Sequence, residues 1–552
     1  MLITAALLFN LQLMSTKIFI QILAATALLT TASTAAAQSC GNDVKYKLPY
    51  KNTYVKEIFT AENEFRTKKP ETIIPGTFEE ARQILPNPIW PGHDKELEMY
   101  WRAWEIAVGN IRQVPEGSGF VSPYIDTAYN GNIFMWDSSF ILMFARYGDR
   151  FFPFQKTLDN FYAKQHPDGF ICREIKSDGA DCFERYDPTS TGPNIIPWSE
   201  IIYYHQYGDI DRLHKIFAPL AGYNKWLKLN HTWQNGTYWS SGWGTGMDNM
   251  PRVPEEYNPI FSHGHMTWLD TNLQQILVDN IMLEIGFYIE RWQEIEDYED
   301  EVKLLSEHVS KHMWNDSTEF LHDQYRDGSL CPTKGIGAYW ALLTPGVLDK
   351  ERMDKLVAHL ENPDEFKRPG MVPSLSHDNP KYRENGRYWQ GGVWPGTNYM
   401  VLSGLTKNGY NDLARSIAQN HYNEVLDVYK KTGTFWEYYS PETSDPGFMA
   451  RDEFIGWTGL APIAELIEYI FGIRGDYVEK EIVWDMSLLD EHGIERYPFG
   501  PDGNITLKAA KRRTADEEPR LTVDSNIPFK LKVLYGKGRE KVVNVVPETK
   551  NY

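Results

Sequence analysis

A helical repeat of apolar residues runs through most of this chain and limits its fold more than any other feature. Leu97, Trp101, Trp104 and Ala107 recur at three- and four-residue intervals, a spacing that places them on one face of a helix. No repeat of fixed period is present, which argues against a helical solenoid. The pattern predicts about twelve helices, near 97–111, 135–147, 151–164, 195–206, 213–227, 268–293, 297–314, 336–343, 348–361, 392–406, 410–430 and 455–472.

Long loops rich in Gly, Pro, Trp and Asp separate many of these helices. Loops of this length in a compact domain usually serve function, so we expect them to build one pocket. Twelve helices joined in this way suit a mainly α fold, an (α/α)6 barrel whose loops converge on a central cleft. The loops in question are 123–134, 166–192, 239–266, 368–391 and 432–454.

The two ends of the chain differ from this helical region. Residues 38–93 mix Pro, charged residues and short apolar pieces, and are expected to form an irregular N-terminal extension. After about Gly475 apolar residues alternate or form β-branched runs, as in 529–534, which predicts strands. We therefore expect a barrel at 94–475 and a small β-rich C-terminal module at 476–552.

The first residues have the pattern of an export signal. Lys17 precedes the apolar run 18–29, and small residues follow up to Ala37, which predicts a signal peptide at 1–37 with the start codon at Met1 or Met14. The apolar run is shorter than the roughly 20 residues that span a membrane. An exported protein, periplasmic or secreted, without a membrane span is expected, and a lipid anchor at Cys40 is left open.

The chain is acidic, with a formal net charge of −19. Affinity for nucleic acids rests largely on Lys and Arg that neutralise phosphates, so a nucleic-acid partner is not expected. The chain also contains 18 Trp, and such rings can pack against the apolar faces of sugars. A small neutral or cationic substrate fits this composition better than a polyanion.

The cysteines and histidines show no metal-binding pattern. Cys172 and Cys182 could pair in an oxidising compartment, whereas Cys331 has no neighbour at ligand spacing and is expected to be a buried thiol. His263 and His265 have no carboxylate at ligand spacing, so hydrogen-bonding roles are expected for them. No cofactor is predicted, and a structural calcium ion is left open.

Two carboxylates stand in the loops with the most distinctive sequences. The loop from Ser240 to Arg252 combines several glycines, Trp243 and Asp248. It resembles the Gly-X-Asp-Asn-X-Pro-Arg loop of the inverting glycosidases related to processing α-glucosidase I and mannosylglycerate hydrolase, and, more distantly, the Gly-Trp-Asp loop of trehalases. The resemblance implies that Asp248 is the general acid.

Further segments resemble the same group, in the same order along the chain. Residues 434–441 resemble its Glu-Asn-Tyr-X-Pro segment, which implies that Glu437 is the general base, with Tyr438 in place of Asn. Residues 387–399 resemble its Tyr-Trp-Arg-Gly-X-Val-Trp-Pro segment, with Gln390 in place of Arg. Two shorter matches are 133–138 and 454–460.

The chemistry of glycoside hydrolysis agrees with this pairing. An acid must protonate the leaving oxygen and, with inversion, a carboxylate about 6.5–9.5 Å away must activate water. A Trp-lined pocket should raise the pKa of Asp248, while Glu437 is expected to stay ionised. Residues expected to contact the sugar are Trp136, Asp137, Trp243, Asn249, Arg252, Gln390, Trp394, Asn398 and Trp436.

Other interpretations stay open at this point. Asp137 could cap the helix that follows it, and Glu384, Glu442 and Glu453 are rival bases on nearby loops. The sequence predicts an inverting, exo-acting hydrolase of an α-linked glucoside that acts on an oligosaccharide or small glycoside. The alternatives are a trehalase, an α-mannosidase or a mannosyl- or glucosylglycerate-type hydrolase, and a glycan-binding protein without catalysis.

Overall fold

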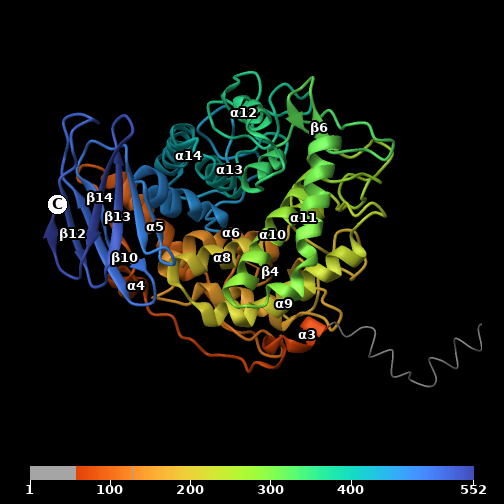
Figure 1. The fold of residues 1–552 in the computed structure, drawn as a ribbon, viewed down its shortest axis with the longest axis horizontal. Coiled ribbons are helices and arrows are strands. Elements are labelled where there is room, and N and C mark those ends of the chain that lie inside the picture. Colours follow the sequence, from red (N-terminus) through yellow and green to blue (C-terminus); the bar gives the residue numbers. More distant parts are fainter. Residues whose placement is uncertain (1–57, 128–129) are drawn as a thin grey trace, which may run out of the picture. The chain divides into compact units, whose positions relative to one another are not determined.

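The computed structural model describes residues 58–127 and 130–552, which form one compact unit from Ile58 to Tyr552 (Figure 1). The predicted signal peptide and Cys40 lie outside the described residues. Helices make up the larger part of this unit, and the longer strands gather at its C-terminal end, at the left of Figure 1. Among the described residues, no helix combines the length and the apolar character needed to cross a membrane.

Every one of the twelve predicted helical runs contains helix, which confirms the periodicity argument. The elements are α5 (Asp94–Gly109), α6 (Met135–Ala145), η3 (Phe154–Leu158) with α7 (Asp159–Ala163), α8 (Ile196–Tyr207), α9 (Ile210–Asn230), α10 (Leu269–Tyr288), α11 (Asp297–His308), η7 (Ile336–Leu343), α12 (Lys350–Ala358), α13 (Pro395–Lys407), α14 (Asn411–Thr432), and η9 (Trp457–Leu460) with η10 (Ala461–Ile470).

The helices fall into two classes by burial. Every residue of α6 except Asp137 is buried, and so is every residue of η7 and η10. In contrast, α11 buries only Tyr298, Glu301 and Leu305 along one side. A helix that is apolar all round belongs inside a protein, whereas a helix with one apolar stripe lies at its surface. The first class therefore forms the centre of the helical region and the second its outside.

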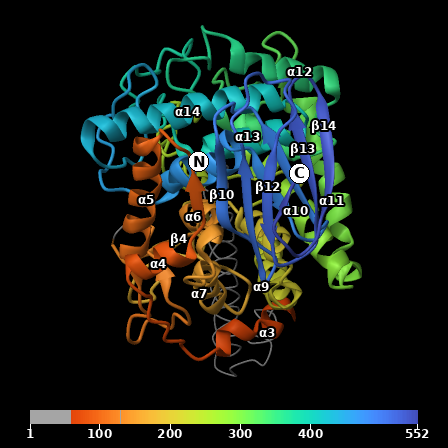
Figure 2. The ribbon, with the colours of Figure 1, turned by 90° about the vertical axis from the view of Figure 1, so that its left-hand side faces the viewer.

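Two sheets form the C-terminal region, as the alternation after Gly475 predicts. Strands order as β1-β10-β11-β12-β15 in one sheet and as β14-β13-β9-β8 in the other. Phe499 and Phe529 join the sheets, with ring centroids 5.7 Å apart. The strands face the viewer in Figure 2. Their bounds are β8 (Ile473–Asp476), β9 (Glu481–Met486), β10 (His492–Phe499), β11 (Gly503–Ala509), β12 (Leu521–Ser525), β13 (Phe529–Tyr535), β14 (Arg539–Val545) and β15 (Lys550–Asn551).

The N-terminal extension is more regular than the sequence indicates. Its described part contains α3 (Ile58–Glu62), η1 (Glu64–Thr67), α4 (Phe78–Ile84) and β1 (Asn87–Ile89). Strand β1 pairs antiparallel with β10, so that Asn87 lies opposite Glu495 and Ile89 opposite Gly493. This pairing covers an edge of the sheet that would otherwise expose unpaired backbone groups.

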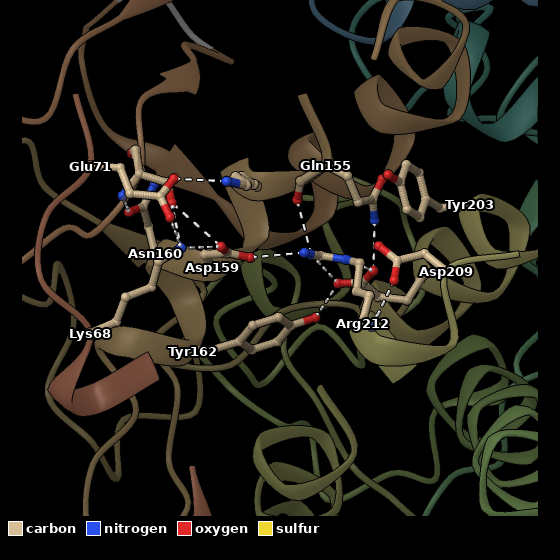
Figure 3. Close-up of polar contacts among 12 residues, drawn as sticks. Lys68, Glu71, Gln155, Asp159, Asn160, Tyr162, Tyr203, Asp209 and Arg212 are labelled. Atoms are coloured by element: carbon tan, nitrogen blue, oxygen red, sulfur yellow. Dashed lines mark hydrogen bonds and ion pairs between the residues drawn. The ribbon is translucent and has the colours of Figure 1, made fainter. Parts of the chain in front are cut away.

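Ion pairs fasten the extension to the helical region (Figure 3). Lys68 lies 2.9 Å from both Glu71 and Asp159, and Glu71 also pairs with Lys156 at 2.8 Å. Arg212, on α9, continues the network to Asp159 at 3.0 Å. Asp159 is almost completely buried, so the charges of Lys68 and Arg212 compensate the cost of burying its carboxylate. The extension is thus an integral part of the fold.

Candidate active site

One pocket of about 520 Å³ receives side chains from all five long loops. Phe134 comes from the first loop, Arg173 from the second, Asp248 from the third, Tyr388 from the fourth and Glu437 from the fifth. The prediction that these loops build one pocket is confirmed. The centre of the helical region supplies the floor through the N-terminal turn of α6.

A second hollow of about 510 Å³ lies at the extension, among Lys68, Asp159 and Arg212. Asp159 pairs with both Lys68 and Arg212 (Figure 3), and none of the sequence motifs reaches this hollow. Its charges stabilise the fold, so the pocket with Asp248 and Glu437 is the candidate active site.

Asp248 lies in a loop shaped by glycine. Gly246 has a left-handed backbone (φ 70°), and a Cβ atom there would lie 3.1 Å from the Trp136 indole nitrogen. The carboxylate of Asp248 accepts a hydrogen bond from the Tyr388 hydroxyl at 3.2 Å. Burial raises the pKa of Asp248 to about 6, while the nearby Arg173 charge and the Tyr388 hydrogen bond act in the opposite direction. A raised pKa is what a general acid needs.

Glu437 is held through its backbone. Its N–H donates to the carbonyl of Arg451 at 2.9 Å, and its own carbonyl accepts from the Trp457 indole at 2.8 Å. Burial, with a contribution from Asp248, raises the pKa of Glu437 to about 7. The sequence predicts a raised pKa for Asp248 only, but desolvation destabilises the charge of Glu437 as well.

Asp137 and Glu174 add further carboxyl groups to the same pocket, and Asp137 lies near Asp248 and Glu437. Asp137 stands in the first turn of α6 and lines the pocket. Burial and the charge of Glu437 raise its pKa to about 7. Neighbouring carboxyl groups that face one cavity hold their protons more tightly than separated ones do. Trp136 and Trp243 line the same pocket, so these three predicted sugar contacts, with Asp248 and Glu437, come together.

The rival bases are placed elsewhere. Glu442 is engaged by Arg368 at 2.7 Å and by the Tyr382 hydroxyl at 2.7 Å. Among the described residues that line the pocket, neither Glu442 nor Glu384 nor Glu453 is present. Of the glutamates weighed for the base, the pocket contains only Glu437.

Arg252 does not face the pocket, contrary to the sequence prediction. Its guanidinium pairs with Asp270 at 2.7 Å and with Asp323 at 2.5 Å, and only 6% of the residue is exposed. Asn398 is also buried and hydrogen-bonds the backbone of Val372 through both of its side-chain atoms. In both cases a buried polar group is satisfied within the protein, which leaves it no free face for a sugar.

Four more of the predicted sugar contacts are not among the residues that line the pocket. Asn249 accepts the N–H of Trp389 at 2.8 Å, and Gln390 donates to the carbonyl of Asn249 at 3.3 Å. Trp394 is almost fully buried in a stack with Trp389 and Tyr438, at centroid distances of 4.1 and 4.2 Å. Trp436 donates to Thr432 and does not line the pocket. Their polar groups and rings hold the loops together.

Several residues that line the pocket were missed at the sequence level. Tyr388 and Trp457 lie inside recognised motifs, so the resemblance could have singled them out. Arg173 and Phe183 lie in the 166–192 loop, where no motif marks them. They contact each other within this loop and also contact Trp243 in the next one, and neither periodicity nor composition reveals such contacts.

The remaining cysteine and histidine predictions can be placed. Among the described residues, Cys172, Cys182 and Cys331 are free thiols, and Cys331 is buried as predicted. Cys182 lies at the pocket wall. The ring of His263 accepts the backbone N–H of His265 at 3.0 Å, a hydrogen-bonding role for a loop histidine.

Residues 130–458 match the sequence model of the family described as "Mannosylglycerate hydrolase MGH1-like glycoside hydrolase domain". The match covers more than half of the chain and includes Asp137, Asp248 and Glu437. The chain belongs to this family. It is a glycoside hydrolase, and the family resemblance predicted from the motifs is confirmed.

Individual relatives of this MGH1-like hydrolase are distant. An uncharacterized protein of Borreliella burgdorferi is 25% identical over 65% of the chain and 75% of its own length. A probable mannosyl-oligosaccharide glucosidase of Schizosaccharomyces pombe is 25% identical over 46% of the chain and 31% of its own length. A glucosylglycerate hydrolase of Mycolicibacterium hassiacum is 23% identical over 46% of the chain and 66% of its length.

Solved structures share the fold. The GH63 mannosylglycerate hydrolase of Thermus thermophilus in complex with glucose superposes with a TM-score of 0.52 at 18% identity, over 66% of this chain and 99% of that one. The neutral trehalase Nth1 of Saccharomyces cerevisiae superposes with a TM-score of 0.51 at 13% identity, over 63% and 73% of the two chains. The MGH1-like hydrolase therefore has the mainly helical fold of these glycosidases, with a β-rich C-terminal region.

Proposed function

We propose that this hydrolase is an inverting, exo-acting enzyme that cleaves an α-linked glucoside, with Asp248 as general acid and Glu437 as general base. The observation that carries the proposal is the meeting of these two carboxyl groups, from loops far apart in sequence, in one Trp-lined pocket. Asp248 donates its proton to the leaving oxygen, and Glu437 takes a proton from the water that attacks the anomeric carbon.

We also propose that the helices close into an (α/α)6 barrel. From α8 onward, largely buried helices alternate along the chain with more exposed ones, namely α9, α11, α12 and α14, whereas η3 and α7 between α6 and α8 are mostly buried. The buried ones contact each other in the order α6, α8, α10, η7, α13 and η9, and η9 contacts α6 again. Such a ring supports a closed inner layer. The pocket takes its floor from α6 and a wall residue, Trp457, from η9, which agrees with loops that converge at one end.

The substrate side of the proposal rests on the pocket walls. Trp136 and Trp243 have flat apolar rings, and the carboxylate oxygens of Asp137 can accept hydrogen bonds from sugar hydroxyls. This combination is suited to a single sugar ring. The relatives named glucosidase, glucosylglycerate hydrolase and mannosylglycerate hydrolase support a glycoside of glucose or mannose as the substrate. The export signal, with a periplasmic or secreted location, and the lipid anchor at Cys40 stay predictions from sequence.

Time-resolved NMR of the first product tests this function. The substrates are trehalose, glucosylglycerate, mannosylglycerate and a panel of α-linked glucose and mannose disaccharides. We expect the β-anomer to appear first from an α-linked glucoside, because water attacks the face opposite the leaving group. Initial release of the α-anomer would contradict inversion, and binding without turnover across the panel would indicate a glycan-binding protein.

A second candidate, a glucosylglycerate-type hydrolase, is favoured by Arg173. Its Nε donates to the carbonyl of Thr189 at 2.8 Å, and its guanidinium lies 4.4 Å from the ring centre of Phe183 and 5.4 Å from that of Trp243. Within residues 58–127 and 130–552, its two terminal amino groups have no hydrogen-bond or ion-pair partner. Such a pair of donors matches a carboxylate, which a glycerate aglycone provides.

Arg173→Gln separates the two candidates. If the aglycone is an acid, kcat/KM for glucosylglycerate should fall about 10- to 100-fold, the effect of losing hydrogen bonds to a charged group. Neutral α-glucosides, measured on the same variant, serve as the matched control and should lose much less. Equal losses of kcat/KM on charged and neutral substrates would show that Arg173 does not bind the charged group of the aglycone.

A further inference from the structure

Tyr388 contacts the proposed acid directly, as the Trp243 side chain also does. Its hydroxyl donates to the Oδ2 atom of Asp248 at 3.2 Å, and the residue lines the pocket. Burial and the charges of Asp248 and Glu437 keep the pKa of Tyr388 well above its ordinary value. The hydroxyl therefore keeps its proton over the working pH range and stays a donor.

The backbone of Tyr388 is held in an unusual conformation. Its φ of 58° lies in the left-handed region, which residues other than glycine seldom adopt. The carbonyl of Tyr388 accepts hydrogen bonds from the N–H of Gly392 at 3.0 Å and from the Trp394 indole at 3.2 Å. Its ring packs edge-on against those of Trp394 and Tyr438. Conformations of this kind persist where surrounding contacts enforce them, and they concentrate at functional sites.

The loop that carries Tyr388 is also bound to the loop that carries Asp248. Asn249, the next residue after the acid, accepts the N–H of Trp389 and donates to the carbonyl of Arg387 at 3.3 Å. Gln390, where the resembling family has Arg, donates to the carbonyl of Asn249. Three hydrogen bonds thus fix the two loops on either side of the contact between Tyr388 and Asp248.

We propose that Tyr388 is a positioning residue that holds the carboxyl group of Asp248 through a hydrogen bond which becomes stronger when that group is ionised. The role rests on the proposed function, in which Asp248 is the acid. The donor stabilises the carboxylate over the acid, so it makes Asp248 a readier proton donor to the leaving oxygen. It also limits how far burial can raise the affinity of Asp248 for its proton.

Six other charged or titratable groups line the same pocket, and two of them are Glu174 and Cys182 on the second loop. Asp137 at the start of α6 and Glu437 on the fifth loop favour the protonated form of Asp248, whereas Arg173 on the second loop favours the ionised form. Arg451 lines the pocket beside Glu437. None of these groups is changed by removing the Tyr388 hydroxyl, so a change in proton affinity can be attributed to the lost hydrogen bond.

Tyr388→Phe tests the role through the pH dependence of kcat/KM. At pH values above the pKa of both Asp248 and Glu437, kcat/KM follows the fraction of Asp248 that is still protonated. Without the hydrogen bond from Tyr388 this fraction rises. We expect the ratio of kcat/KM at pH 8.5 to that at pH 5 to increase about tenfold, which corresponds to an increase of about one in the pKa of Asp248. Because the ratio is taken within one variant, a general loss of activity cancels.

Tyr382→Phe is the matched control. Tyr382 lies in the same long loop and donates to a carboxylate too, that of Glu442 at 2.7 Å, but neither residue lines the pocket. Its ratio should equal that of the wild type. A glucosyl fluoride provides a second control, because fluoride leaves without a proton and the ratio should then not respond to Tyr388→Phe.

If the ratio of kcat/KM at pH 8.5 to that at pH 5 is unchanged in Tyr388→Phe, the proposal is overturned. A raised KM would then indicate that Tyr388 contacts the sugar, and a loss of stability alone would indicate a packing role. Asp248→Asn is measured alongside. If Asp248→Asn retains full activity on the natural substrate, the proposed function itself fails. If it loses activity while Tyr388→Phe leaves the ratio unchanged, only the role of Tyr388 fails.

Discussion

Asp248→Asn and Glu437→Gln should each lower kcat/KM on an α-linked glucoside by about a thousandfold, within the range expected for loss of a general acid or base. Both side chains line the pocket and both carry a raised pKa because of burial. The amide replacements keep the size of each side chain, so the loss reflects proton transfer. Steady-state kinetics on the substrate that the NMR panel identifies gives the measurement.

The leaving group separates the two roles. With glucosyl fluoride, Asp248→Asn should recover most of its activity, whereas Glu437→Gln should not, because water still needs a base. Glu442→Gln is the control, since Glu442 pairs with Arg368 away from the pocket. If Glu442→Gln lost as much activity as Glu437→Gln, the assignment of the base would be wrong.

The pKa values predict how activity depends on pH. In the proposed mechanism Asp248 works protonated and Glu437 works ionised, yet burial puts the pKa of Asp248 at about 6 and that of Glu437 at about 7. In the free enzyme, a base that holds its proton at least as tightly as the acid does leaves only a minority of molecules with both groups in the working form. Activity should be highest between these values, and a bound sugar that orders the charges would enlarge the active fraction.

The helices and loops could be predicted because their signals are local. Apolar spacing marks a buried stripe wherever it occurs, as in α5, and loop composition marked all five segments that reach the pocket. Strand β1 could not be predicted: Asn87, Pro88 and Ile89 carry no strand pattern, and their partner β10 lies about 400 residues later. Pairing with a distant edge leaves no local signal.

The site shows the same division between local and distant information. The motifs identified Asp248 and Glu437 because each residue sits in a distinctive short sequence. They did not reveal the direction in which a polar side chain points. Arg252 and Asn398 have hydrogen-bonding groups suited to a sugar, but both point into the protein. Arg173, which does line the pocket, stands in a loop without a motif.

Arg252→Met is the second change with a large expected effect, and it acts on stability. Asp270 and Asp323 are both buried, and each is bound by the Arg252 guanidinium through two hydrogen bonds. Without Arg252, two carboxylates would remain buried with no cation, which should lower the free energy of unfolding by about 3–5 kcal/mol. Chemical denaturation at pH 7 measures this loss.

The same variant distinguishes a structural from a sugar-binding arginine. The loss should shrink at pH 5, because burial already raises the pKa of Asp323 and removing the cation raises it further, so this carboxyl group takes up a proton as the pH falls. Arg102→Met is the control: its exposed pair with Glu105 is expected to contribute no more than about 1 kcal/mol. An Arg252→Met protein of unchanged stability but raised KM would restore the role in sugar binding that the sequence suggests. If Arg252→Met greatly lowers the stability, the two residues of the Gly-X-Asp-Asn-X-Pro-Arg loop have separate roles. Asp248 then takes part in the chemistry, and Arg252 keeps the loop that carries the acid folded.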